Sequence, residues 1–228
     1  MTGPTSGPDI VIVDYGLGNI RSIANAIAYV GGRAIVSGDP ARIAAAEGLI
    51  LPGVGAFPKG MENLGWRELT GPVCDFAASG RPLLGICLGM QMLMERGFEH
   101  RETAGLGLIP GEVLRLPTDG GSRLPHIGWT GLIEPQPGRW AGTLLDRAHD
   151  RNFYFVHSYA ALPADDAHVL ARASHGGREF AACVESGAIM GTQFHPEKSG
   201  DAGLALLRRF LTRCSSRAAP APRAVAAR

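Results

Sequence analysis

One cysteine constrains this chain more than any other residue, because glycines flank it in the order Gly85-Ile86-Cys87-Leu88-Gly89. An apolar stretch precedes it, and a segment of helical character follows. Small residues at these two places let a strand and a helix pack closely around a strained turn, which pushes the residue at its tip outward. The spacing therefore predicts a nucleophile elbow, with a strand at 83–86 and a helix from Leu88 to Arg96.

The expected helix would direct its free N–H groups and the positive end of its dipole at the sulfur of Cys87. This arrangement favours the thiolate, and the same N–H groups can hold an oxyanion. A free cysteine is more commonly a small buried apolar side chain. The flanking glycines favour the nucleophile instead, and so does a histidine near the C-terminal end of the chain.

That histidine belongs to the segment Gly191-Thr192-Gln193-Phe194-His195-Pro196-Glu197. A cysteine nucleophile needs an imidazole within hydrogen-bond reach, and the imidazole needs a third group that fixes its tautomer. Because Pro196 restricts the backbone between them, His195 and Glu197 should point the same way from an extended segment. Cys87, His195 and Glu197 are therefore the expected catalytic residues.

The chain alternates short apolar runs with segments of helical period, which predicts a doubly wound, mostly parallel α/β sheet flanked by helices. Parallel strands are expected at 10–13, 33–36, 48–51 and 83–86. Asn19 and Asp39 stand where the first two helices should be capped. Beyond Gly105, short strands are expected at 112–116, 132–133, 153–156, 169–173 and 180–184. These predict a mixed or antiparallel extension of the sheet, closed by a helix at 201–213.

The length of the chain bounds its domain organisation. A chain of 228 residues suits one sizeable domain, which we expect over residues 9–213. Residues 1–8 are expected to be a flexible N-terminus. Residues 214–228 are alanine, proline and arginine with little else, and are expected to be a disordered basic tail.

Charge and cysteine content exclude several classes of function. The 22 basic and 21 acidic residues give a formal net charge of +1, so there is no general attraction to nucleic acid or an anionic membrane. No apolar run approaches the roughly 20 residues of a membrane span. The four cysteines have neither the spacing of a zinc site nor the density of a disulfide framework, which suits a reducing cytoplasm. Neither a metal nor a cofactor is expected.

A second glycine-rich loop, Pro52-Gly53-Val54-Gly55, follows the third expected strand and should meet Cys87 at one edge of the sheet. Backbone N–H groups at Val54, Gly55 and Leu88 would then form an oxyanion hole. Glycine on both sides of Val54 lets one peptide turn over at low strain, so this hole is expected to be switchable. An ordinary glycine turn is the alternative.

The elbow and His195-Pro196-Glu197 together resemble the class I glutamine amidotransferases. Four further segments resemble a narrower group in that family, the glutaminase subunits of imidazole glycerol phosphate synthase. These segments are Asp14 to Asn19, Pro52 to Phe57, His126 to Trp129 and Phe153 to Tyr159. The resemblance covers roughly residues 9–211.

The resemblance implies that glutamine is hydrolysed to glutamate and ammonia through a thioester on Cys87. Its glutamine-binding residues are expected at Gly53, Gln91, Ser158 and Tyr159. A separate cyclase subunit, a (β/α)8 barrel, would form a heterodimer with this chain, receive the ammonia and make imidazole glycerol phosphate and aminoimidazole carboxamide ribotide in histidine biosynthesis. Contacts with that partner are expected at Asn19, His126 and Trp129.

Two other functions fit parts of the pattern. A cysteine hydrolase of the α/β-hydrolase type would use the same elbow on esters or peptides, but its acid precedes the histidine, whereas Glu197 follows His195. A non-catalytic partner subunit would keep the fold without needing a cysteine, a histidine and a glutamate in this arrangement. A glutaminase assay with the partner and its ligand present distinguishes these functions.

Overall fold

A seven-stranded sheet forms the centre of the computed structural model, which describes residues 7–117, 122–146, 148 and 152–217. The strand order is β11-β12-β13-β4-β3-β1-β2. The parallel strands are β1 (Asp9–Val13), β2 (Arg33–Ser37), β3 (Gly48–Leu51), β4 (Leu83–Ile86) and β13 (Ile189–Thr192). The antiparallel strands β12 (Arg178–Ser186) and β11 (Val169–His175) continue the sheet. The expected doubly wound α/β fold with an antiparallel extension is confirmed.

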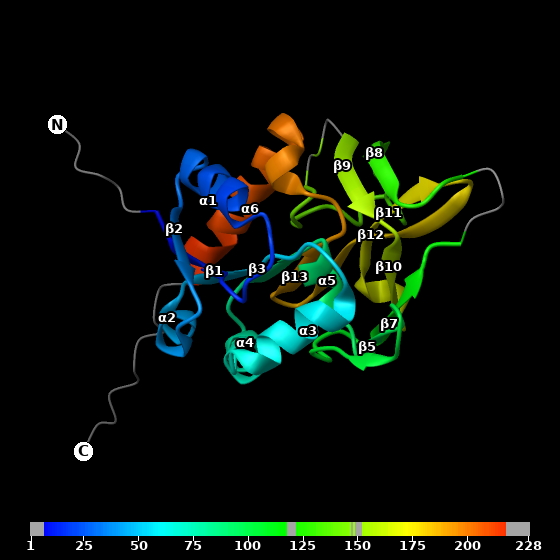
Figure 1. The fold of residues 1–228 in the computed structure, drawn as a ribbon. Helices are drawn as coiled ribbons and strands as arrows, with labels where there is room; N and C mark the ends of the chain where they lie inside the picture. The colour runs from blue at the N-terminus through cyan, green and yellow to red at the C-terminus, as the bar shows by residue number, and fades with distance from the viewer. Residues whose placement is uncertain (1–6, 118–121, 147, 149–151, 218–228) are drawn as a thin grey trace, which may run out of the picture.

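Helices cover both faces of this sheet (Figure 1). One face packs against α1 (Ile20–Tyr29) and α6 (Gly200–Arg217). The other packs against α2 (Pro40–Ala45), α3 (Phe57–Trp66), α4 (Thr70–Ala78) and the short α5 (Leu88–Met92). Side chains alternate between the two cores along β1, with Ile10 and Ile12 in the first and Val11 and Val13 in the second. Both faces are covered, which is why the central parallel strands β1, β3 and β4 are largely apolar and buried.

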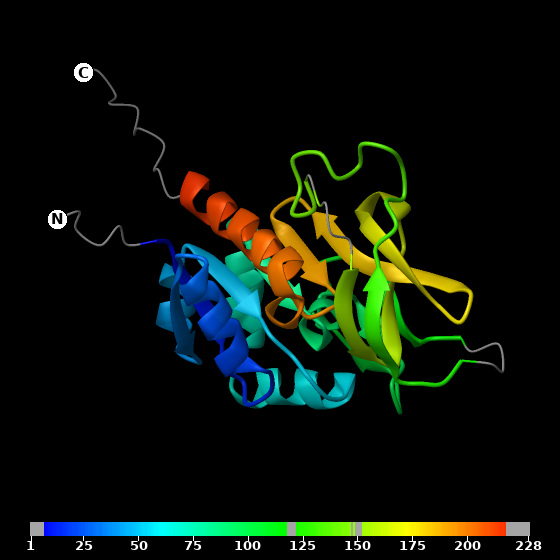
Figure 2. The ribbon, with the colours of Figure 1, turned by 90° about the horizontal axis from the view of Figure 1, so that it is seen from above.

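Two smaller sheets lie beside the main one (Figures 1 and 2). The first contains β10 (Tyr159–Pro163), β7 (Gly111–Arg115), β5 (Arg96–Gly97) and β6 (Thr103–Ala104). The second pairs β8 (His126–Gly131) with β9 (Asn152–His157). Single 3-10 turns, η1 (Asp166–His168) and η2 (Pro196–Lys198), complete the elements. The backbone N–H of His195 donates to the carbonyl of Tyr154 on β9 at 2.9 Å, which joins this second sheet to the chain leaving β13.

Three expected boundaries are wrong. The helix after Cys87 ends at Met92 rather than Arg96, because Arg96 and Gly97 pair with β6 and β7. Residues 132–133 form only a bridge between Ile133 and Arg172. Helix α6 continues to Arg217 because Cys214 is buried in the core, so residues 214–217 are not part of a disordered tail. Residues 1–6 and 218–228, where the rest of the flexible ends was expected, lie outside the described residues.

Candidate active site

Cys87 occupies the tip of a tight turn between β4 and α5. Its backbone has φ 55° and ψ −110°, a conformation that costs free energy for any residue but glycine. A Cβ on Gly85 would lie 2.7 Å from the backbone of Gly89, and a Cβ on Gly89 would lie 1.9 Å from the carbonyl oxygen of Leu51. Only glycine fits at either position, so the strand, turn and helix meet as the sequence predicts.

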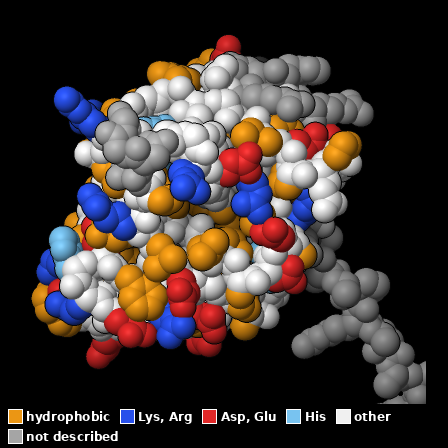
Figure 3. Space-filling view, turned by 90° about the vertical axis from the view of Figure 1, so that its right-hand side faces the viewer, with side chains coloured by type: hydrophobic (Ala, Val, Ile, Leu, Met, Phe, Trp, Pro, Cys, Tyr) orange, Lys and Arg blue, Asp and Glu red, His pale blue; other side chains and the backbone are white. Residues whose placement is uncertain are grey.

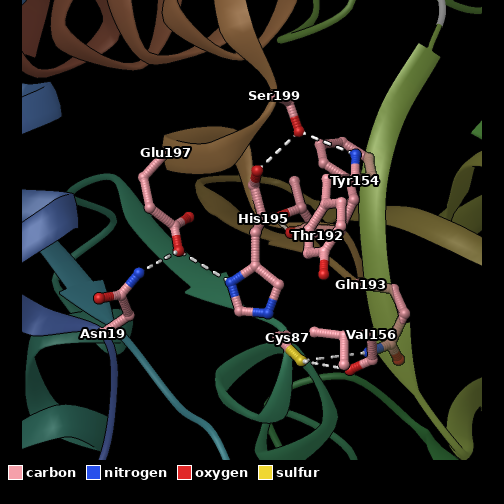
Figure 4. Close-up of polar contacts among 10 residues, drawn as sticks. Asn19, Cys87, Tyr154, Val156, Thr192, Gln193, His195, Glu197 and Ser199 are labelled. Atoms are coloured by element: carbon pink, nitrogen blue, oxygen red, sulfur yellow. Dashed lines mark hydrogen bonds and ion pairs between the residues drawn. The ribbon is translucent and has the colours of Figure 1, made fainter. Parts of the chain in front are cut away.

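Polar groups from the neighbouring strands surround the sulfur (Figure 4). The backbone N–H of Cys87 donates to the carbonyl of Thr192 at 2.7 Å. The thiol lies 3.9 Å from the carbonyl oxygen of Val156, and Nε2 of Gln193 lies 3.7 Å from Sγ. Cys87 is only 6% exposed, so the protein covers most of the thiol.

Backbone and hydroxyl contacts hold His195 in place after β13. Besides the bond from its N–H to Tyr154, its carbonyl accepts a hydrogen bond of 2.6 Å from Oγ of Ser199. The same Oγ accepts from the backbone N–H of Tyr154 at 3.0 Å. Ser199 thus bridges the histidine to β9, and the imidazole is left only 1% exposed.

The two nitrogens of the His195 ring face different groups. Nδ1 lies 2.8 Å from Oε1 of Glu197. Nε2 is buried, has no hydrogen-bond partner among the described residues, and faces the sulfur of Cys87 in Figure 4. Burial on its own lowers the pKa of this imidazole, but the thiol of Cys87 and the carboxylate of Glu197 outweigh it and raise the pKa to about 9. This arrangement favours an imidazolium facing the sulfur.

The carboxylate of Glu197 is fully buried and has a second partner. Nδ2 of Asn19 donates to Oε1 at 3.3 Å, beside the bond from His195. Asn19 precedes α1 as expected, but its side chain makes no capping hydrogen bond, so its expected role as a helix cap is wrong. Its amide is directed at the carboxylate instead (Figure 4).

A cavity of about 320 Å³ opens over the sulfur. Its wall brings together most of the residues expected from the sequence: Cys87, His195, Val54, Gly55, Leu88, Gln91, Ser158 and Tyr159. It is completed by Glu99, Pro125, Val156 and His157. Gly53 lies behind this wall, where a Cβ would be 2.7 Å from Cβ of Leu88 and 2.9 Å from the backbone nitrogen of Gly89.

The loop between β3 and α3 forms the open side of the cavity. Val54 is 39% exposed, and Gly55 has φ +106° with nothing within 4 Å of the place that a Cβ would take. Leu88, by contrast, is the first residue of α5 and is buried. The three expected oxyanion donors therefore differ in conformational freedom, because Val54 and Gly55 lie in an open loop and Leu88 lies in a packed helix.

The sequence of this chain is similar to those of known proteins. The family model of class I glutamine amidotransferases matches residues 11–214. This chain belongs to that family. It is 50% identical over 201 residues to imidazole glycerol phosphate synthase subunit HisH of Lacticaseibacillus casei, covering 88% of this chain and 94% of that protein. Its identity to the subunit HisH of Methanothermobacter thermautotrophicus is also 50%, over 204 residues, 89% of this chain and 97% of that protein.

Solved structures of low sequence identity share the fold of this glutamine amidotransferase. One described as a glutamine amidotransferase has a TM-score of 0.69 at 20% identity, covering 90% of this chain and 98% of its own. PurLQS from Thermotoga maritima has a TM-score of 0.67 at 23% identity, with the same coverage. Among the described residues, no helix is long and apolar enough to cross a membrane, and no group of side chains has the arrangement of a metal site.

Within the amidotransferase cavity, Gln91 is fixed by its amide group. Its Nε2 donates to the carbonyl of Tyr159 at 2.8 Å and to Oε1 of Gln193 at 3.0 Å. Because Nε2 of Gln193 in turn faces Sγ of Cys87, these contacts connect the floor of the cavity to the sulfur. Tyr159 contributes its backbone carbonyl to this network.

His126, expected at the partner interface, is buried inside the domain, with only 4% of its surface exposed. The alternation of β8 turns His126 inward and leaves Ile127 and Trp129 60% and 58% exposed. Its Nδ1 lies 3.2 Å from Nε2 of His157, so its side chain cannot itself contact a partner and the expectation is wrong. Trp129 remains available on the surface.

Both of these buried imidazoles stay neutral. Burial, with the charge of His175 nearby, lowers the pKa of His126 to about 4. Burial outweighs the hydrogen bond from the ring to the Tyr159 carbonyl and lowers the pKa of His157 to about 3. Since Nδ1 of His157 donates to that carbonyl, its Nε2 accepts a hydrogen bond from Nδ1 of His126.

Glu99 is the wall residue that sequence reasoning missed. It is the one carboxylate among the residues that line the cavity, and its Oε2 accepts a hydrogen bond of 2.7 Å from the backbone N–H of Phe57. It stands in a loop after β5, with no glycine, histidine or cysteine spacing to distinguish it. Only the fold brings this loop to the elbow.

Proposed function

We propose that this chain is the glutaminase subunit of an imidazole glycerol phosphate synthase, with Cys87, His195 and Glu197 as its catalytic residues. The observation that carries the proposal is the buried sulfur facing an imidazole, whose other nitrogen is bound to a buried carboxylate, at the base of a cavity. The 50% sequence identity to HisH subunits over nearly the whole chain also supports the proposal.

In the first half of the reaction the thiolate of Cys87 attacks the side-chain carboxamide carbon of glutamine. The carbonyl oxygen becomes an oxyanion, which the N–H of Leu88 and an N–H of the Val54–Gly55 loop stabilise. The imidazolium of His195 then gives its Nε2 proton to the departing amine, and ammonia leaves. A glutamyl thioester on Cys87 remains.

In the second half, His195 is neutral and acts as a base. It takes a proton from water, which attacks the thioester and releases glutamate and the thiolate. Glu197 fixes the tautomer throughout, because Oε1 holds the proton on Nδ1 and so directs Nε2 at the sulfur. No redox step and no external group enter this sequence.

Glutamine also carries an α-ammonium and an α-carboxylate that the cavity must hold. The carboxylate of Glu99 is the acceptor in the cavity wall that can pair with a cation, so we assign the α-ammonium to it. Backbone N–H groups at Ser158 and Tyr159 would then lie near the α-carboxylate. Gln91 acts by holding the Tyr159 carbonyl.

HisH proteins are named as subunits of a synthase, so we infer that the ammonia passes to a second subunit. We propose that this partner is the cyclase subunit, a (β/α)8 barrel, bound in the cytoplasm against the end of the sheet that carries the site. The exposed Trp129 and Ile127 on β8 would contribute apolar contact area there. On the face of Figure 3, basic and acidic side chains among the described residues are interspersed, which suits a protein partner better than a polyanion.

The test uses the complex of both subunits with glutamine or with ammonium chloride as nitrogen source. Cys87→Ala should abolish glutamine-dependent formation of imidazole glycerol phosphate and leave the ammonia-dependent rate within about twofold of wild type. Glutamine turnover near the wild-type rate in this variant would overturn the assignment of the nucleophile. Loss of both rates would mean that the subunits no longer assemble, which gel filtration of the complex checks.

A further inference from the structure

Tyr15 is the buried residue whose position the proposed mechanism leaves unexplained. It directly follows the turn after β1, and none of its surface is exposed. Its hydroxyl donates a hydrogen bond of 2.6 Å to the carbonyl oxygen of Pro52, the first residue of the oxyanion loop. Burial and the nearby Cys87 raise the pKa of Tyr15, so the phenol keeps its proton and stays a donor.

The contact joins two loops that are 37 positions apart in the chain. On the other side, the backbone carbonyl of Tyr15 accepts a hydrogen bond of 3.1 Å from Nδ2 of Asn63 on α3. Tyr15 therefore binds the first residue of the oxyanion loop and the helix after the loop. It also closes off the space beside Gly53, where a Cβ would lie 2.8 Å from the phenolic oxygen.

The far end of the oxyanion loop is fixed as well. Oε2 of Glu99 accepts from the N–H of Phe57, the first residue of α3. Between these two anchors Gly53 is packed against the elbow, while Val54 is partly exposed and Gly55 faces open space. A peptide rotation in this loop is therefore confined to the few bonds between Pro52 and Phe57.

We propose that Tyr15 is a positioning residue for glutamine hydrolysis: its hydroxyl holds the Pro52 carbonyl and so fixes where the N–H of the oxyanion loop points when the loop is in its working state. This rests on the proposed function. Tyr15 does not touch the reacting atoms. It acts through the peptide plane that holds the Pro52 carbonyl and the Gly53 N–H, which anchors the start of the loop from which the N–H groups of Val54 and Gly55 project.

The experiment replaces only the hydroxyl. Tyr15→Phe keeps the ring in the core, and glutamine hydrolysis is measured in the complex with the cyclase subunit and its nucleotide ligand. We expect kcat to fall about tenfold, less than the 100- to 1,000-fold that loss of a whole oxyanion donor causes. KM for glutamine should stay within twofold, because the groups that hold its ammonium and carboxylate are untouched.

Thr143→Val is the matched control. Thr143 is buried, and its Oγ1 donates to the carbonyl of Trp140 at 2.7 Å and accepts from the N–H of Leu145 at 3.2 Å, so this variant deletes two buried hydrogen bonds to the backbone. It should lower the melting temperature at least as much as Tyr15→Phe does, while kcat stays within twofold of wild type. The rate of Cys87 alkylation by iodoacetamide should be unchanged in both variants, because the elbow itself is intact.

The outcomes distinguish a failure of the positioning role of Tyr15 from a failure of the proposed glutaminase function. If wild type hydrolyses glutamine and Tyr15→Phe matches its kcat, Tyr15 has no positioning role. Equal losses of kcat in Tyr15→Phe and Thr143→Val would also overturn it, because the effect would then be general destabilisation. If the wild-type complex hydrolyses no glutamine, the proposed function fails first.

Discussion

Asn19 donates its side-chain amide to the same carboxylate of Glu197 that orients the imidazole, across 178 positions of sequence. This contact joins the start of α1 to the turn after β13. It places a neutral donor on a buried carboxylate whose Oε2 has no partner among the described residues. The orientation of the imidazole that we propose as the catalytic base therefore involves a residue from the opposite end of the chain.

Substitutions at these positions should form a graded series. His195→Ala should abolish glutaminase activity, and Glu197→Gln should leave a residual rate, because the orienting group is one step removed from the chemistry. Asn19→Ala should lower kcat by about three- to tenfold through loss of one hydrogen bond to a charged group. Asn19→Asp should be worse than Asn19→Ala, because it sets two carboxylates against each other. Steady-state kinetics of the complex measures all four.

Asn25→Ala is the control for this series, since Asn25 is exposed on the same helix. It should retain the wild-type kcat. If Asn19→Asp were as active as wild type, the contact with Glu197 would have no part in orienting the base.

The oxyanion loop offers a second prediction, about stimulation by the partner. The isolated chain should hydrolyse glutamine slowly and gain 100-fold or more with the liganded cyclase subunit, because one missing oxyanion donor is worth that much. Gly55→Pro should reduce this gain to less than tenfold, because proline cannot adopt the φ of +106° found there. Partner affinity, measured by isothermal titration calorimetry, should change less than the stimulation does.

Position 53 is a poorer place to test the same idea. A Cβ there would meet the backbone nitrogen of Gly89, so Gly53→Ala disturbs the elbow itself. An isolated chain as fast as the liganded complex, or normal stimulation of Gly55→Pro, would show that the loop is not the switch.

The paired imidazoles of His126 and His157 predict an acid-labile fold. Their folded-state pKa values, about 4 and about 3, lie below the ordinary 6.5. Between these values the unfolded chain is protonated at both histidines and the folded chain is not. Stability from these groups is therefore present above pH 6.5 and is lost as pH falls towards 4. The loss amounts to about 1.4 kcal/mol per pH unit for each histidine. Urea unfolding between pH 7 and 4.5 measures this slope.

His126→Gln should remove about half of that slope, because one of the two proton-binding groups is gone. His100→Gln is the matched control, since His100 is exposed on a loop. It should leave the pH dependence of unfolding unchanged. An identical slope for His126→Gln and wild type would mean that another group governs acid unfolding.

Much of this fold can be predicted from the sequence, because the signals for it are local. The elbow follows from two glycines that only close packing explains, and α2 begins where Asp39 precedes Pro40, with the Asp39 carboxylate accepting from the N–H of Ala41. The parallel strands follow from apolar runs buried on both faces. Each of these signals lies within a few residues of the feature it predicts.

What was missed depends on contacts between distant segments. Asn19 has the residue type and position of a cap, yet its side-chain oxygen makes no capping bond and its Nδ2 donates to a carboxylate from the other end of the chain. His126 lies on a strand that the sequence pattern did not reveal, so its inward direction could not be read. Glu99 reaches the cavity because a short strand, β5, ends beside the elbow, and no local motif records that.

The two glycines of the elbow have a consequence for anyone who redesigns this enzyme. A saturation library across residues 85–89 should return glycine at both flanking positions whatever reaction is selected, since even one methyl group would collide with backbone atoms. The central residue meets a different constraint, because its φ of 55° is strained for any side chain and most of all for bulky or β-branched ones. Selection for a new nucleophile can therefore test small unbranched side chains such as serine at position 87, while the requirement for glycine at 85 and 89 reflects contact with backbone atoms and not the chemistry.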